Sequence, residues 1–386
     1  MTYPLASNAV DARRPASPGT LRWRSRWLRD LAPGLLAGIT TGDWLRLLCD
    51  NGFKVSPRFW LRALTITFQS AFNSFESWCY GSHVEDVTVP PPVFVLGHWR
   101  SGTTHLHRLL TVDDRFAYPN SYEALYPHTF VATEAVNARL IEALLPNRRP
   151  MDDMEWNIRL PQEDEFALCV SSFESPCMGW VFPRRQQHYD RYLTLRGVSR
   201  REMVRWQRAL LGFLQKLTVK YHRPLVLKSP PHTCRIKLLL ELFPKAKFVH
   251  IHRDPYVVFQ SSRRTFQVNF GLARLQNAPR HDLDDWIFRQ YRAMYEAFFE
   301  ERELIPEGQF HEVRFDDLES NPIGELRRLY VALDLPDFVH CEAALKRYVD
   351  SVAGHEKNEF PSLAPELRAR IATEWRQYFH RWGYSV

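Results

Sequence analysis

Short apolar runs alternate with longer helical stripes along most of this 386-residue chain. A run of 3–6 apolar residues bounded by turn residues is typical of a buried strand, whereas apolar residues every three or four positions indicate a helix. Strand-type runs lie at 93–96, 225–227, 247–252 and 310–315. Helical stripes follow at 200–221, 235–243, 255–266 and 321–333. This alternation predicts an α/β fold with a three-layer core, in which helices flank a central parallel sheet.

The same pattern divides the chain into three parts. Residues 1–20 are polar and rich in Pro and Ser, and we expect a disordered tail. Residues 21–90 form an N-terminal helical extension, with an Asn51-Gly52 turn inside it. The main domain takes residues 91–386, and within it we expect 111–160 to be irregular because prolines interrupt the stretch.

Charge is concentrated at the N-terminus. Of the net charge of +7, a net +5 lies in residues 1–60, where nine Lys and Arg face four Asp. The rest is close to neutral, so the folded domain lacks the basic excess of a nucleic-acid-binding protein. Residues 22–75 combine basic and aromatic positions, which favours contact with a membrane surface; packing against the core or against a second copy in a homodimer are the alternatives.

Other compositional signals are weak. The six cysteines are scattered without metal-ligand spacing, so we predict reduced thiols and no metal site. The first 30 residues lack the apolar block of a signal peptide, and the longest apolar runs are too short to span a bilayer. We therefore expect a soluble or peripheral protein.

The most informative segment is the loop that follows the first strand. It reads Gly97-His98-Trp99-Arg100-Ser101-Gly102-Thr103-Thr104 and leads into a helical pattern. A glycine-bounded loop between a strand and a helix wraps backbone N–H groups around a phosphate. The lysine that follows the second glycine in nucleoside-triphosphatases is replaced by Thr103, and the positive charge comes from Arg100.

This loop, together with Arg253 and Ser261 far downstream, resembles the sulfotransferase superfamily, in particular the broad bacterial branch with a Gly-x-x-Arg-Ser-Gly-Thr-Thr loop. The motifs extend from Val93 to the C-terminus, about three quarters of the chain. The resemblance implies a P-loop-type core and 3′-phosphoadenosine 5′-phosphosulfate (PAPS) as sulfuryl donor. It also implies a cytoplasmic protein, and contact with the inner membrane surface stays open.

The resemblance also implies which residues bind the donor. The 5′-phosphosulfate is expected at the loop, against Arg100 and the N–H groups of Ser101 to Thr104. Arg253 and Ser261 resemble the clamp for the 3′-phosphate, because a guanidinium can hold a phosphate through two hydrogen bonds. Lys357 is similar to a residue that folds over the nucleotide in relatives. The expected donor-binding set is Gly97, Ser101, Gly102, Thr103, Thr104, Arg253, Ser261 and Lys357.

Two residues after the second strand are candidates for the chemistry. Lys228 corresponds to a lysine that attends the bridging oxygen in the cytosolic branch of the family. His232 follows four residues later instead of two, and we prefer it as the base that takes the acceptor proton. Glu163 is the second candidate, and Glu165 and Glu123 are further alternatives. The acidic triplet 163–165 has a purely structural interpretation as the first turn of a helix.

The acceptor is expected to be a hydroxyl compound, held by segments 115–200 and 265–285. The aromatic content and the N-terminal extension favour a lipid-like molecule. A nucleotide-dependent kinase with the same loop is an alternative, with Asp254 as the nearest magnesium ligand. A relative that binds the nucleotide without catalysis is another.

Overall fold

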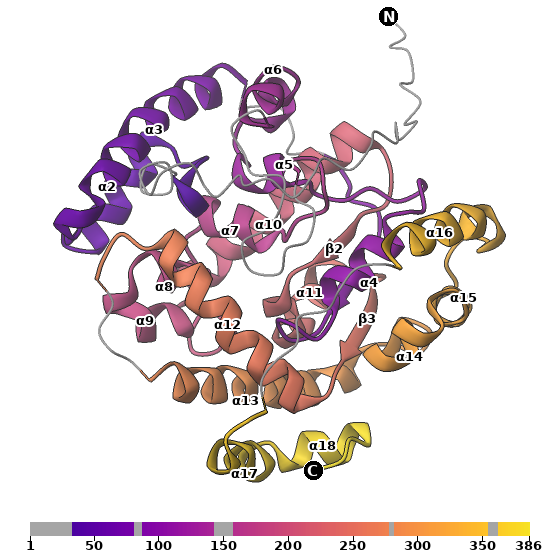
Figure 1. Ribbon diagram of the computed structural model, residues 1–386. Helices are drawn as coiled ribbons and strands as arrows, with labels where there is room; N and C mark the ends of the chain where they lie inside the picture. Colours follow the sequence, from indigo (N-terminus) through magenta and orange to yellow (C-terminus); the bar gives the residue numbers. More distant parts are fainter. Residues whose placement is uncertain (1–32, 81–86, 143–156, 278–281, 354–361) are drawn as a thin grey trace, which may run out of the picture.

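A parallel four-stranded sheet, in the order β2-β1-β3-β4, forms the centre of the computed structural model (Figure 1). The structure describes residues 33–80, 87–142, 157–277, 282–353 and 362–386. The strands are β1 Val93–Leu96, β2 Val226–Lys228, β3 Lys247–His252 and β4 Phe310–Arg314. The predicted strands and the α/β class are therefore confirmed.

Side chains that alternate along the strands build two separate cores. In β1, Val93 and Val95 pack with helix α4 and the C-terminal helices, while Phe94 and Leu96 face a larger aromatic cluster on the other side of the sheet. This follows from the two-residue period of a strand, which places neighbouring side chains on opposite faces. The result is the three-layer arrangement that the sequence predicts.

The helices on the first face are α4 Thr103–Leu110, α14 Phe315–Ser320, α15 Pro322–Ala332 and α16 Val339–Val352. The second face contacts the larger cluster, which draws on α7 Glu165–Ser171, α8 Met178–Val181, α10 Arg200–Tyr221, α11 Ile236–Leu242, α12 Pro255–Ala273, α13 Leu283–Glu301, α17 Pro365–Glu374 and α18 Arg376–Trp382. The short elements are η1 Gly34–Leu36, η2 Pro57–Phe59, η3 Pro183–Arg185, α9 Gln186–Asp190, η4 Pro230–Cys234 and η5 Arg302–Leu304.

The stretch 111–160 differs from its prediction, because it contains two helices, α5 Ser121–Leu125 and α6 Phe130–Glu142. Helix α5 begins with a capping box, in which Asn120 and Glu123 each bond to the other's backbone N–H. Such a box stabilises even a five-residue helix. The expectation of irregular structure was therefore wrong for these two segments.

Two helices precede the sheet, α2 Thr41–Asp50 and α3 Trp60–Tyr80. Polar side chains attach α3 to the preceding chain. The Asn73 amide donates to the carbonyls of Ala37 at 2.8 Å and Ile39 at 2.9 Å, and the Ser74 hydroxyl accepts from the Thr41 N–H at 2.7 Å. In Figure 1, α2 and α3 lie at the outer rim of the molecule, far from α15 and α16. The expected tail 1–20 and the first residues of the extension, 21–32, lie outside the described residues.

We expect Asn73→Ala to lower the free energy of unfolding by about 1–3 kcal/mol, because two carbonyls at a buried position lose their donor. Urea unfolding followed by circular dichroism measures this change. Ala71→Ser, at an exposed position two residues away on α3, is the control and is expected to stay within about 0.5 kcal/mol of the parent. An unchanged midpoint for Asn73→Ala would contradict the attachment described above.

Candidate functional site

The carboxyl ends of the parallel strands meet at one edge of the sheet, and the predicted site residues gather there. Strand β1 lies between β2 and β3, so Lys228 at the end of β2 and Arg253 after β3 lie on opposite sides of the loop that follows β1. Their backbones are about two strand spacings apart, roughly 10 Å. Open α/β sheets bind ligands at the carboxyl ends of their strands, at the point where the strand order reverses direction. In this sheet that point lies at the end of β1.

The two glycines of the loop are required by close approaches of the backbone. At Gly97, with φ 143°, an added Cβ would lie 2.5 Å from the Ile251 carbonyl oxygen. At Gly102, with φ 103°, it would lie 2.3 Å from the ring of Phe315. Both φ values are also unfavourable for residues with a side chain. The loop is thus packed tightly between β3 and α14.

Several hydrogen-bond donors of the loop bond to acceptors within the protein. The Gly97 N–H donates to the Thr233 hydroxyl at 2.7 Å. The Ser101 N–H and hydroxyl both donate to the His98 carbonyl, at 3.1 and 2.7 Å. The sequence analysis expects Ser101 to donate to a phosphate. In this structure, the N–H and the hydroxyl of Ser101 instead donate to a carbonyl within the loop.

The N–H groups of Thr103 and Thr104 are differently placed. These residues begin α4, and the first N–H groups of a helix have no acceptor within the helix. The helix dipole adds partial positive charge at the same end. A phosphate at this position would meet donors of the kind that the sequence predicts.

Arg100 joins the two halves of the predicted donor site. Its backbone adopts the left-handed region with φ 73°, and its Nε donates to the Ser261 hydroxyl at 2.8 Å. Residues 161 positions apart in the sequence are therefore in direct contact at the loop. The structure brings together the residues that the resemblance assigns to opposite ends of the donor.

Arg253 lies beside this pair and stacks on an aromatic ring. Its guanidinium carbon lies 4.0 Å from the centre of the Phe315 ring, a cation–π geometry that orients the guanidinium plane. Burial lowers the pKa of Arg253, and nearby Arg100 lowers it further, while Glu319 opposes both effects. Two arginines held close together in a partly buried position favour a bound anion. Phe315 is a site residue that sequence reasoning missed.

On the other side of the loop, Lys228 contacts Glu163. The lysine Nζ lies 2.7 Å from a Glu163 carboxylate oxygen, and the two side chains are 3% and 12% exposed. Lys228 pairs in the sheet with Val95, one residue before the end of β1. The ammonium and the carboxylate therefore lie next to the phosphate loop. Two of the four predicted catalytic residues are in direct contact.

The base that the sequence analysis prefers, His232, lies deeper in the protein. Its side chain is 0% exposed and its Nε2 lies 2.5 Å from Asp164, whose other oxygen accepts from the Ser229 hydroxyl at 2.8 Å. Burial alone would raise the pKa of Asp164, but the charge of His232 and the hydrogen bonds from His232 and Ser229 outweigh it and lower the pKa. This geometry makes His232 part of a buried hydrogen-bonded group with Asp164 and Ser229.

The remaining acidic candidates also have structural partners. Glu165 forms a fully buried pair with Arg235 through two hydrogen bonds of 2.7 and 3.2 Å. Glu123 accepts from Lys220 and Tyr221, each at 2.6 Å, in addition to its role in the capping box. Neither arrangement is that of a base facing a substrate. The triplet 163–165 lies at the start of a helix, as its structural interpretation predicts, because Asp164 precedes α7 and Glu165 lies in its first turn. In addition, each of the three acids bonds to a basic side chain.

Two further expectations concern residues elsewhere. Lys357 lies outside the described residues. Asp254, the nearest magnesium ligand for the kinase alternative, caps helix α12 and accepts from the N–H groups of Tyr256 at 2.7 Å and Val257 at 3.2 Å. Its carboxylate therefore has a structural role, which weakens the kinase interpretation.

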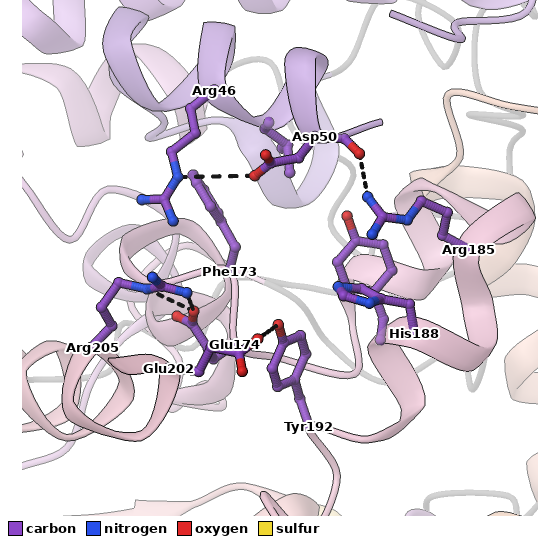
Figure 2. Close-up of a pocket in the computed structure, with 11 residues that line it drawn as sticks. Arg46, Asp50, Phe173, Glu174, Arg185, His188, Tyr192, Glu202 and Arg205 are labelled. Carbon is purple, nitrogen blue, oxygen red and sulfur yellow. Dashed lines mark hydrogen bonds and ion pairs between the residues drawn. The ribbon is translucent and has the colours of Figure 1, made fainter. Parts of the chain in front are cut away.

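Figure 2 shows a separate cavity of about 300 Å³ between α2, α9 and α10. Its charged side chains are paired within the protein: Arg205 bonds to Glu174, Arg185 bonds to the Asp50 carbonyl, and Tyr192 donates to Glu202. None of the predicted site residues lines it. The positive and negative groups balance, so the cavity lacks the positive excess of the strand edge.

Comparison with known proteins agrees with this geometry. Residues 91–339 match the model of the sulfotransferase family. The chain is 40% identical over 366 residues to the ω-hydroxy-β-dihydromenaquinone-9 sulfotransferase Stf3 of Mycobacterium bovis and to its counterpart in Mycobacterium tuberculosis, and covers 94% of both chains in each case. Among solved structures, sulfotransferase STF9 from Mycobacterium avium aligns with a TM-score of 0.69 at 20% identity, over 90% of this chain and 98% of that one. STF1 from Mycobacterium tuberculosis H37Rv aligns with a TM-score of 0.54 at 19% identity, with the same coverage.

Buried histidines around the loop make the stability depend on pH. Burial lowers the pKa of His98 to about 4, and burial together with Lys228 lowers that of His107 to about 3. In the unfolded chain both take up protons near pH 6.5, whereas the folded protein does not. The unfolded state thus binds more protons between about pH 4 and 6.5, so stability must fall as the pH falls through this window.

We expect each of these histidines to contribute a slope that rises toward about 1.4 kcal/mol per pH unit as the pH falls from 7 to 5, measured by urea unfolding. His107 lies 3.1 Å from the Val226 carbonyl through Nε2, and His107→Gln keeps a donor there but cannot titrate. It should reduce the slope. A stability that stays constant over this range, or a slope unchanged by the substitution, would contradict the assignment of neutral buried histidines.

Proposed function

The chain belongs to the sulfotransferase family, and we propose that it transfers the sulfuryl group of PAPS to the hydroxyl of a lipid-like acceptor. Sulfotransferase activity follows from the family match and from 40% identity over almost the whole chain. The single observation that supports the donor is the contact between Arg100 and Ser261, with Arg253 alongside. This contact joins Arg100 of the phosphate loop to Ser261 of α12, next to Arg253.

PAPS suits the positive charges and the backbone N–H groups at the loop. The 5′-phosphosulfate would lie at the start of α4, against the Thr103 and Thr104 N–H groups and Arg100. The 3′-phosphate would contact Arg253 and Ser261 on the β3 side. The glycines Gly97 and Gly102 keep the backbone close enough for this arrangement.

The acceptor would approach from the β2 side, where Glu163 and Lys228 lie. In the reaction, the bond from sulfur to the acceptor oxygen forms while the bond from sulfur to the 5′-phosphate oxygen breaks, and the acceptor proton passes to a base. Lys228 and Arg100 would stabilise the charge that develops on the leaving oxygen. The strand order supports this proposed division of roles, since Lys228 and Arg253 lie on opposite sides of the loop.

The geometry favours Glu163 over His232 as the base. Glu163 is partly exposed and lies beside Lys228, whereas His232 is fully buried and bonds to Asp164. A base must reach the proton that it removes, either directly or through one water. We therefore assign proton removal to Glu163 and give His232 and Asp164 the role of fixing η4 and the chain before α7.

The relatives in Mycobacterium bovis and Mycobacterium tuberculosis are described as acting on ω-hydroxy-β-dihydromenaquinone-9. We propose an acceptor of the same chemical class for this chain, a hydroxyl group at the end of a long apolar lipid. Support comes from the identity of 40% over 94% of each chain.

Donor binding can be tested by thermal shift with adenosine 3′,5′-bisphosphate. At one hundred times its dissociation constant, a ligand that binds only the folded state stabilises it by about 2.7 kcal/mol. We expect this stabilisation with the bisphosphate, less with adenosine 5′-phosphate, and its loss in Arg253→Ala. Arg264→Ala, an exposed arginine of α12, is the matched control and should behave like the parent. Equal stabilisation by ATP would instead favour the kinase alternative.

Substitutions at the two candidate bases separate their roles. Glu163→Gln should lower turnover by a factor of about 10²–10⁴ and leave bisphosphate binding intact, because only proton removal is lost. His232→Gln should lower the unfolding free energy, because the buried Asp164 carboxylate loses its hydrogen bond to the imidazole. Turnover with PAPS and unfolding are measured for both. If His232→Gln abolished turnover at full stability while Glu163→Gln stayed active, the assignment would be reversed.

A further inference from the structure

Helix α3 presents a continuous apolar face to solvent. Its exposed large apolar residues, 46% to 83% accessible, are Trp60, Leu61, Leu64, Phe68, Phe72, Phe75 and Trp78. Most are three or four positions apart, so they lie on one side of the helix. The contiguous apolar patches of soluble proteins are usually small, and larger ones mark interaction sites.

The inward side of α3 is unusually polar. Arg62 is buried and donates to the Arg274 carbonyl at 2.9 Å. Ser70 and Asn73 are also buried, and Asn73 is bonded to two carbonyls of the preceding chain. A helix on the surface of a soluble protein normally has the opposite arrangement, with the apolar side inward. The polarity of α3 is therefore reversed along much of its length.

On the described part of α3, the exposed side has no charged residue. Among the α3 residues whose side chains the structure describes, the one charged residue is Arg62, which is buried. The exposed side of α6 continues this character with Val131, Ala132, Ala135 and Val136. The two helices are linked through Tyr126. Its hydroxyl accepts from the Gln69 side chain of α3 at 2.8 Å, and its backbone carbonyl accepts from the Phe130 N–H at the start of α6.

We propose that this α3–α6 face docks on the surface of a lipid bilayer. Trp60 and Trp78 lie near the two ends of the apolar stripe, and tryptophan prefers the interface between lipid and water. Exposed Lys54 and Arg58 lie just before α3, within the N-terminal 60 residues that hold a net +5. Positive charge beside an apolar face is the combination that binds anionic membranes in the plane of the interface. In the described part of the chain, no helix has the length and apolarity to cross a bilayer.

The α3–α6 face is linked to the segment that carries Glu163. The relevance of this link to a lipid acceptor rests on the proposed function. Pro161, two residues before Glu163, forms an antiparallel bridge with Asn120, which caps α5. Helix α5 leads to Tyr126, which contacts α3 through Gln69. The bilayer face is thus connected to the acceptor side of the site by a short chain of contacts.

Vesicle flotation of the full chain tests the docking without donor or acceptor. The vesicles contain phosphatidylcholine with 30% phosphatidylglycerol, at 0.1 M and 0.5 M salt. We expect binding of the parent chain, and a fall of about tenfold or more in the partition coefficient for Phe68→Ser/Phe72→Ser, since each substitution removes a large apolar contact with lipid. This loss should persist at 0.5 M salt, which screens the electrostatic part.

The matched control is Val331→Ser/Val339→Ser, at two exposed apolar positions of α15 and α16, which lie away from α3 in Figure 1. It should bind like the parent. Circular dichroism and bisphosphate stabilisation must remain unchanged in both variants, so that failure of docking is distinguished from failure of the proposed function. Docking is overturned if the parent chain does not float, or if the phenylalanine variant floats equally well. A parent dimer that dissociates on the same substitution, without vesicle binding, would assign the face to a second copy.

Discussion

The site depends on the parallel pairing of β1 with β2 on one side and β3 on the other. In this register Val95 lies opposite both Lys228 and Val249, so three chain segments end at the same edge within about two strand spacings. Gly97 can follow β1 there only because it has no side chain to collide with the Ile251 carbonyl. This pairing determines where each group lies, because the loop follows β1, Lys228 ends β2 and Arg253 follows β3.

Electrostatics then separates the two sides of the loop. On the β3 side, Arg100 and Arg253 are close enough for one to affect the pKa of the other, and this concentration of positive charge suits a phosphate. On the β2 side, successive acids at 163–165 pair with Lys228, His232 and Arg235. Two of these pairs are fully buried, where loss of one partner leaves an uncompensated charge. They fix the segment that carries Glu163, and they leave Glu163 as the acid of the three that is nearest to solvent.

The features that the sequence predicts well are those with local signals. The bounds of β3 and α10 agree residue for residue with their expected ranges, because the apolar pattern of these segments is readable in the chain. The structure also brings Arg100 and Ser261, both predicted site residues, into direct contact. Contacts between distant segments were not predictable: the pairs from 163–165 to 228–235 span 65 to 70 residues, and no spacing rule relates them. For α5 a usable signal existed, since Asn120 and Glu123 have the spacing of a capping box.

The reversed polarity of α3 has a cost that its own contacts cannot offset. Its inward polar groups are well bonded, as the contacts of Asn73 and Ser74 show, but bonded polar groups contribute little net stability compared with buried apolar surface. A helix that served only to stabilise the domain would gain by placing Phe68 and Phe72 inward and its serines outward. Keeping the phenylalanines outside makes sense when they are buried in another environment during function. In the docking that we propose, a bilayer supplies that environment, and for the proposed lipid acceptor it would also bring enzyme and acceptor to the same surface.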